Sequence, residues 1–216
     1  MRTEALRFPS PERCRDGSPP EKMCIRDSVY TDPEDPEGFS AGFVEAVDGQ
    51  HTLMCDLTPW GQIDGWRVRR NQDVIQVLSG EEYEQRLAML MAYHGQHHRF
   101  FFTDAPAEDT DLLLSVLLEC RARREIVSII IGDDMITGRV TEANGLRLKL
   151  RVLDFFGREA EEETITLREI EILEIDTQEE RMYAVLEELE RQRMTLLPGG
   201  AEKESGAPSG EEPEEP

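Results

Sequence analysis

An internal repeat constrains the fold of this chain more than any other feature of its sequence. Gly42 and Gly138 lie 96 residues apart, and glycine, apolar and acidic positions recur in order at that offset. The matches are Val44 with Val140, Gly49 with Gly145, Met54 with Leu150, Leu57 with Leu153, Trp60-Gly61 with Phe156-Gly157, Asp73-Val74 with Glu169-Ile170, Val77 with Leu173 and, after a slip of one residue, Gln85-Arg86-Leu87 with Glu180-Arg181-Met182. A fixed offset of this kind indicates two copies of one fold.

The second copy has the pattern of five short strands. The expected strands are 126–131, 135–143, 146–152, 164–167 and 169–175. Asn144-Gly145 predicts a tight hairpin turn, because a type I′ turn needs positive φ at both positions. Residues 157–163 have the composition of an acidic loop. We expect such half-buried strands to close into a small barrel, since closure removes exposed sheet edges.

The first copy has the same order but a shorter beginning. Residues 29–31 would be the remnant of its first strand, and 32–38 form a loop rich in proline and acid. Residues 39–47 predict the second strand, with Asp48-Gly49 as its turn. Helical spacing of apolar residues predicts three helices, over 81–93, over 110–124 with Thr110 as its cap, and over 179–196 with Met182, Leu186, Leu189 and Arg193 on one face.

Both ends differ from the middle of the chain. Residues 23–28 resemble a peptide produced when sequencing-adapter DNA is translated, so we interpret the start as a disordered or artefactual leader. The end of the chain is rich in Glu, Pro, Gly and Ser and is expected to be disordered. The predicted organisation is 1–28 leader, 29–95 first barrel with its helix, 96–109 connector, 110–200 helix, second barrel and C-terminal helix, and 201–216 acidic tail.

A helix followed by a strand, a long bent hairpin and two closing strands resembles the Sm-like family of SH3-like barrels. In the second copy, residues 136–154 take the place of the first Sm motif and 165–175 the place of the second. The resemblance implies a mainly β chain with flanking helices: two tandem, small, five-stranded SH3/Sm-like barrels linked by helices.

The residues of the family's RNA pocket are largely absent. RNA-binding members have an Asn shortly after the loop Asp of the first motif and Arg-Gly in the second. Here the corresponding segments are Asp154-Phe155-Phe156-Gly157, Arg168-Glu169 and, in the first copy, Gln72-Asp73. The Arg is present in one copy and the Gly in neither, so the resemblance extends to the fold more than to RNA binding.

The charge balance narrows the class of partner. The 216 residues include 24 basic and 46 acidic side chains, a formal net charge of −22. Such a field repels phosphates, which disfavours a protein that coats nucleic acid or an anionic membrane. No apolar run approaches the roughly 20 residues of a spanning helix, and no signal peptide is evident. We therefore expect a cytoplasmic protein without a membrane partner.

Two aromatic residues occupy the same repeat position beside a glycine. The rings of Trp60 and Phe156 either pack inward and close the loop of the barrel, or project outward and contact a partner. Arg67, Arg69 and Arg70 form a small basic cluster, read either as a partner contact or as a solvated face.

Arg147, Lys149 and Arg151 make a basic stripe on one strand face. With Arg168 they are the candidate RNA contacts. Cross-strand pairing with Glu142 or with residues 161–163 is the alternative account of the stripe. The first copy has His51, Leu53 and Cys55 at these positions, so the stripe is not a property of the repeat.

The histidines are the remaining candidate for site chemistry. His94, His97 and His98, with Asp104 nearby, could bind a transition metal, but a solvated connector is the preferred interpretation. Residues 100–102, three phenylalanines, are expected to pack between the barrels. No phosphate-binding loop or nucleophile–base pair is present, so we predict no enzyme, no metal and no cofactor.

Two functions follow from these features. The preferred one is a non-enzymatic adaptor or regulatory module that docks a protein partner. The alternative is an Sm-like protein that binds RNA through the basic stripe. Oligomerisation through strand edges is open in either case.

Overall fold

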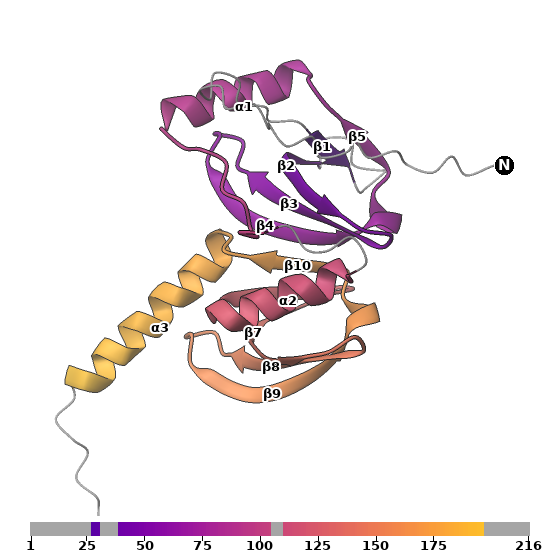
Figure 1. Cartoon of the computed structure of the whole chain (residues 1–216). Coiled ribbons are helices and arrows are strands. Elements are labelled where there is room, and N and C mark those ends of the chain that lie inside the picture. Colours follow the sequence, from indigo (N-terminus) through magenta and orange to yellow (C-terminus); the bar gives the residue numbers. More distant parts are fainter. Residues whose placement is uncertain (1–26, 31–38, 105–109, 197–216) are drawn as a thin grey trace, which may run out of the picture.

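The computed structural model describes residues 27–30, 39–104 and 110–196. The elements of the first half are β1 (Asp27–Tyr30), β2 (Phe39–Val47), β3 (His51–Leu57), β4 (Ile63–Arg70), β5 (Gln76–Leu78) and α1 (Glu82–Tyr93). Those of the second half are α2 (Leu112–Arg123), β6 (Ile126–Ile131), β7 (Asp134–Ala143), β8 (Arg147–Leu153), β9 (Glu159–Thr166), β10 (Ile172–Ile175) and α3 (Gln178–Leu196). The halves lie one above the other, and α3 projects from the lower one (Figure 1).

The described strands form one antiparallel sheet in the order β5-β1-β2-β3-β4-β10-β6-β7-β8-β9. The prediction of a mainly β chain with flanking helices is confirmed. The halves are not separate sheets, because β4 pairs with β10 and not with β5. We call this pairing the seam. Each half contributes its strands in the same order. The first half gives β5-β1-β2-β3-β4, and the second half, on the other side of the seam, gives β10-β6-β7-β8-β9.

The two halves share their irregularities as well as their strand order. The register shift between Val44 and Ala46 recurs between Val140 and Glu142, again 96 residues on. A Cβ on Gly42 would lie 2.0 Å from the carbonyl oxygen of Cys55, and one on Gly138 would lie 2.3 Å from that of Arg151. Both glycines are therefore required where two backbones approach closely.

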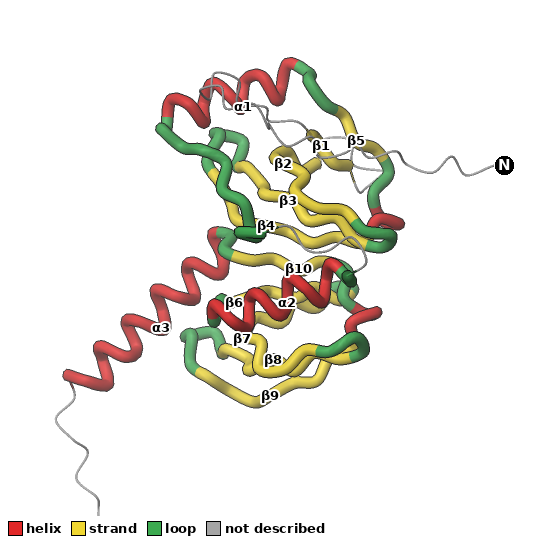
Figure 2. The backbone as a smooth tube through the Cα atoms, viewed as in Figure 1, coloured by secondary structure: helices red, strands yellow, loops and turns green. Residues whose placement is uncertain are grey.

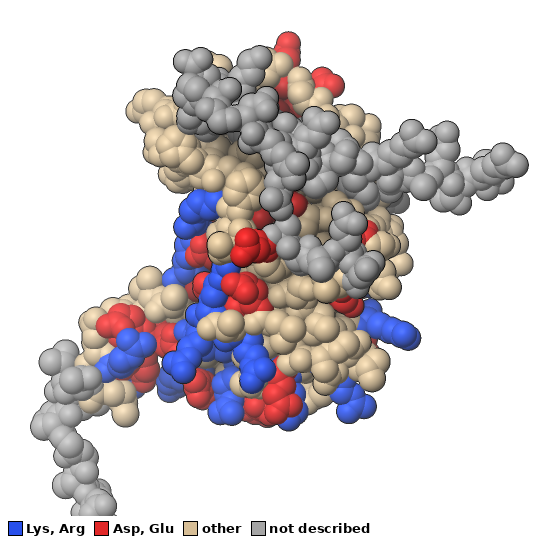
Figure 3. All heavy atoms as spheres, viewed as in Figure 1, with Lys and Arg blue, Asp and Glu red and all other residues tan. Residues whose placement is uncertain are grey.

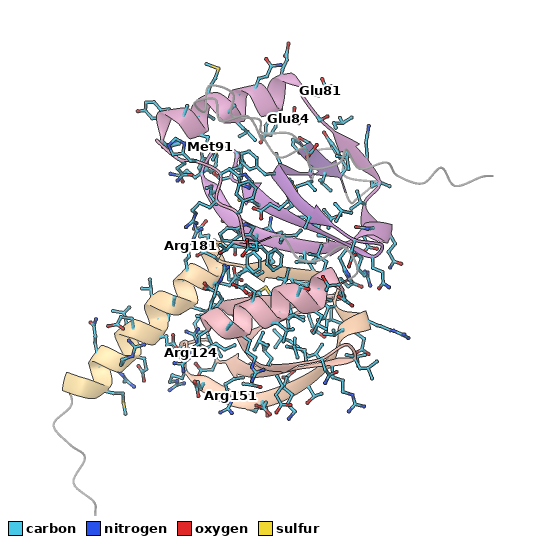
Figure 4. The ribbon with its side chains drawn as sticks, in the orientation of Figure 1. Glu81, Glu84, Met91, Arg124, Arg151 and Arg181 are labelled. Carbon is cyan, nitrogen blue, oxygen red and sulfur yellow. The ribbon has the colours of Figure 1, made fainter. Side chains whose placement is uncertain are left out.

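A buried Ser–Glu pair occurs in each half and was not predicted. Ser28 of β1 donates a hydrogen bond to Glu84 of α1, and Ser128 of β6 donates to Glu180 of α3 at 2.5 Å. All four residues are buried, and Glu84 lies on the side of α1 that faces the strands (Figure 4). The two glutamates are 96 residues apart, so the predicted slip of one residue at these helices is wrong.

Three local predictions are corrected by the structure. The expected acidic loop 157–163 is largely strand β9, because ladder bonds to β8 and cross-strand ion pairs outweigh the low strand preference of glutamate. Asp111 caps α2 in place of Thr110, by accepting a hydrogen bond from the Leu114 N–H. Met182 and Leu189 of α3 are half exposed, whereas Glu180 of the same helix is buried.

The core is continuous across the seam. One buried cluster includes Leu53 and Val68 from the first half, Leu113 and Val116 from α2, and Leu173 of β10, with others from both halves. Helix α2 contacts both β7 and β3, so it bridges the two halves. After α1 the chain runs as a loop over the first half toward the seam (Figure 2).

β1 begins at Asp27, inside the predicted leader, and has four residues against six in β6. The rest of the adapter-like segment, the proline-rich loop 32–38, part of the connector and the acidic tail 201–216 lie outside the described residues.

Asp48 links the first hairpin turn to α2. Its carboxylate accepts hydrogen bonds from the N–H groups of Gln50 (2.7 Å), His51 (2.6 Å) and Leu112 (2.8 Å). Burial alone would raise the pKa of Asp48, but these three backbone donors and the nearby His51 hold it below its usual value of 3.8.

We expect this depressed pKa to make stability acid-sensitive. A carboxylate whose pKa is lowered by folding stabilises the native state above its unfolded pKa, and that contribution is lost as pH falls through the folded pKa. Urea unfolding between pH 6 and pH 2 should therefore lose stability less steeply in Asp48→Asn than in the wild-type chain. Equal pH slopes for the two proteins would contradict this role.

Candidate functional site: two equivalent aromatic loops

The first aromatic loop, residues 58–62, joins β3 to β4. Its ends are closed by a hydrogen bond from the Thr58 N–H to the Gln62 carbonyl (2.8 Å). Gly61 has φ +74°, and a Cβ there would lie 2.6 Å from Leu90 Cβ in α1. The loop is thus held flat against α1 by its glycine, while 64% of Trp60 remains exposed.

The second aromatic loop, residues 154–158, joins β8 to β9 in the same way. The Asp154 N–H donates to the Arg158 carbonyl (2.9 Å), and Gly157 (φ +76°) packs against α3, where a Cβ would lie 2.9 Å from the Glu187 nitrogen. Phe156 is 58% exposed and Phe155 82%. The Arg158 guanidinium lies 5.1 Å from the Phe156 ring centroid.

A salt bridge stiffens the second loop. Arg158 pairs with the Asp154 carboxylate at 2.6 Å, and the backbone N–H groups of Arg158 and Phe156 also donate to that carboxylate. The Arg158 hydrogen bond is the largest influence, and with the backbone donors it lowers the pKa of Asp154. In both loops the glycine packs on a helix, and more than half of the aromatic side chain before it is exposed. The aromatic side chains therefore project into solvent, which fits the second of the two sequence interpretations.

Arg67, Arg69 and Arg70 are brought together, but in ion pairs. Arg67 bridges Asp56 of β3 and Glu174 of β10, the latter at 2.5 Å, and so crosses the seam. Burial would lower the pKa of Arg67, but the two carboxylates raise it. The other two pair with Asp56 (3.6 Å, from Arg69) and with Asp73 and Glu171 (2.6 and 3.0 Å, from Arg70). This cluster holds the halves together.

The basic stripe is largely neutralised by neighbouring strands. Lys149 pairs with Glu142 at 3.0 Å, and Arg151 lies 3.6 Å from Glu162 and 3.8 Å from Glu159. The prediction of cross-strand pairing is confirmed for these two cations. Arg147 and Arg168 are exposed and form no ion pair within the described part of the chain. Basic and acidic groups alternate over the second half (Figure 3).

The missing stripe of the first half has a structural cause. His51, Leu53 and Cys55 are buried, because the chain after α1 covers this face. Phe101 enters the core there, 5.6 Å from the Trp66 ring, as expected for a phenylalanine that packs between the halves. Phe100, in contrast, is exposed.

Glu45 is the structural centre that the sequence did not reveal. Its side chain is 4% exposed and accepts hydrogen bonds from Trp66 Nε1 (2.9 Å) and the Phe101 N–H (2.8 Å). His98 Nε2 lies 2.9 Å from the same carboxylate, and its ring stacks on Phe43 with centroids 4.1 Å apart. The expectation of a solvated connector is therefore wrong for His98, although His94 and His97 are exposed.

Glu45, Cys55 and His98 offer possible metal ligands within 4.8 Å of one another. The carboxylate is already occupied by three hydrogen-bond partners, and burial raises the pKa of the Cys55 thiol, which disfavours the thiolate a metal would need. The arrangement suits a structural role. A cleft of about 450 Å³ is lined by Arg181, Arg99 and Asp176, and both arginines pair with the Asp176 carboxylate. Arg181 lies at the upper end of α3 (Figure 4).

Comparison with protein families, with curated proteins and with solved structures finds no match to this chain. None of the helices in the described residues is both long and apolar enough to cross a membrane.

Proposed function

We propose that this chain is a non-enzymatic interaction module, built from two divergent Sm-like halves, that docks a protein partner through its two aromatic loops. The observation that carries the proposal is the repetition of one arrangement 96 residues apart. In each loop a glycine with positive φ packs on a helix, and the aromatic residue before it is exposed.

Exposed aromatic side chains on rigid supports suit protein binding. Tyrosine, tryptophan and arginine dominate the energetics of interfaces, and a side chain that is already fixed loses less entropy on binding. The backbone beside Trp60 and Phe156 is fixed by the close contacts of Gly61 with α1 and of Gly157 with α3. With a net charge of −22, the module favours a partner whose apolar pockets lie in a basic or neutral surface.

RNA binding has weaker support. Phosphate recognition needs cations that are free to replace counterions, and Lys149 and Arg151 are paired with carboxylates. Arg147 and Arg168 remain for this alternative, which the following experiment separates from the preferred function.

The test is affinity capture from host-like lysate with the full chain, with and without nuclease. Replacing Trp60 and Phe156 together by Ser should reduce the recovered protein partner about tenfold or more, because interface anchors carry most of the binding energy. The partner should remain after nuclease treatment of the wild-type sample.

The matched control is Leu146→Ser. Leu146 is also an exposed apolar residue of the second half (68%), but it lies in the turn between β7 and β8, at the other end of β8. The Leu146→Ser variant should recover the same amount of the protein partner as the wild-type chain recovers. Recovery of RNA together with nuclease-sensitive proteins, lost on replacement of Arg147 and Arg168, would contradict the proposal and support the alternative.

A further inference from the structure

The two halves use the same strand edge differently. The outer edge of β4 is paired with β10, whereas β9, its equivalent 96 residues on, lies at the end of the sheet. Residues of β4 next to the seam, such as Trp66 and Val68, are buried, and their equivalents Glu162 and Thr164 are exposed. Among the residues that the structure describes, one edge therefore occurs in both an occupied and an open version.

The seam shows how this edge binds a strand. Within it, Ile172 lies opposite Arg69, Leu173 opposite Val68, and Glu174 opposite Arg67. An ion pair from Arg67 to Glu174 fixes the register, and a second one joins Arg70 to Glu171. Ladder bonds thus provide the affinity, and opposite charges select the partner strand.

At the open edge the selecting charge is reversed. The position of Arg67 is taken by Glu163, which lies opposite Leu150 of β8 and forms no ion pair within the described part of the chain. Glu163 is half-buried, and the exposed Glu161 of the same strand also forms no ion pair there. In a strand docked in the seam's register, the residue at the position of Glu174 would lie opposite Glu163. Charge complementarity therefore requires a basic residue at that position of the docked strand.

The chain's own fifth strand does not meet this requirement. In the seam's register, β5 of a second copy would set Leu78 against Glu163, and residues 76–79 contain no base. Burial of an uncompensated carboxylate beside leucine is unfavourable. Charge complementarity therefore selects a foreign segment over self-assembly.

We propose that the β9 edge binds an extended, basic segment of a protein partner, with a Lys or Arg opposite Glu163. The inference rests on the proposed role as an interaction module, but it names a surface separate from the aromatic loops. Failure of the Trp60 and Phe156 variants in lysate would leave the β9 experiment unaffected, and the converse also holds.

The test uses a peptide taken from the seam itself. Residues 169–177, which include β10, are synthesised with Glu169→Lys, Glu171→Lys and Asp176→Lys, so that the peptide is basic, and carry either Arg in place of Glu174 or, as the reference, Glu174 itself. Fluorescence anisotropy with the full chain should show about tenfold tighter binding of the Arg peptide. Glu163→Arg should reverse the preference, since the new cation then matches the Glu peptide.

The control variant is Glu188→Arg, which changes the net charge equally but lies on α3. It should keep the wild-type preference for the Arg peptide. Equal binding of both peptides, no binding of either, or an unchanged preference in Glu163→Arg would overturn the proposal. Light scattering on the same samples adds one more outcome against it: a stable dimer that excludes both peptides would show that a second copy occupies this edge.

Discussion

Replacing Gly65 by Ala is expected to cost more stability than any other single change considered for this protein. Gly65 lies in β4 at the end of the seam with φ +78°. A Cβ there would lie 2.2 Å from the carbonyl oxygen of Ile175 and 2.4 Å from that of Asp176. Because both are backbone atoms, β10 must move away. We expect the free energy of unfolding to fall by about 4 kcal/mol.

The control for this change is Gly80→Ala. Gly80 has the same φ, +78°, but a Cβ there meets nothing within 4 Å, so only the left-handed conformation is penalised, by about 1 kcal/mol. Urea unfolding followed by tryptophan fluorescence compares the two, since Trp66 is buried beside the seam. Similar losses in both variants would show that the seam is not closely packed at Gly65.

The second large effect is expected at Glu45. Glu45→Ala leaves the indole N–H of Trp66 and the backbone N–H of Phe101 without their acceptor, and His98 without its partner. Unsatisfied buried donors each cost about 1–3 kcal/mol, so we expect a loss of about 3 kcal/mol in the free energy of unfolding.

The repeat supplies the control for Glu45. Thr141 is the equivalent residue of the second half, and its hydroxyl donates to Glu162 at 3.0 Å on a partly exposed face. Thr141→Ala should cost less than about 1 kcal/mol. A result in which the two variants are equally stable would mean that Glu45 does not anchor the chain after α1.

The strands were predictable where apolar residues alternate and turn signals are strong. Hairpin turns do begin at Asn144 and Asp48, and each N–H donates to a carbonyl three residues on, that of Arg147 and of His51 respectively. The type I′ geometry expected at Asn144-Gly145 is wrong, because neither residue has positive φ, and Gly49 has none either. The Asn144 and Asp48 side chains instead stabilise the turns by accepting hydrogen bonds from the backbone N–H groups two and three residues on. The pairing of β4 with β10 was not predictable, because no local pattern records which distant strand covers an edge. The end of β9 was predicted, but residues 159–163 were missed because the strand's four glutamates have low strand preference, and pairing with β8 decides their conformation.

The candidate site could be predicted only in part, because it also depends on contacts between residues distant in sequence. Trp60 and Phe156 were recognised because the repeat aligns them, but their exposure depends on Gly61 and Gly157 meeting α1 and α3. Glu45 gave no signal, since its equivalent is a threonine and its three partners are distant in sequence. The hydrogen bond from Ser128 to Glu180 was likewise not predictable from the sequence, because the two residues are distant along the chain and only the fold brings them together.

The most direct test of the aromatic-loop account is site-specific photo-cross-linking in lysate. A benzophenone-bearing residue replaces Trp60, Phe156 or, as the reference, Leu146 in the full chain. The account predicts that positions 60 and 156 both form adducts with the same protein, resistant to nuclease, and that position 146 does not. Adducts that contain RNA, or adducts formed equally from position 146, would contradict it.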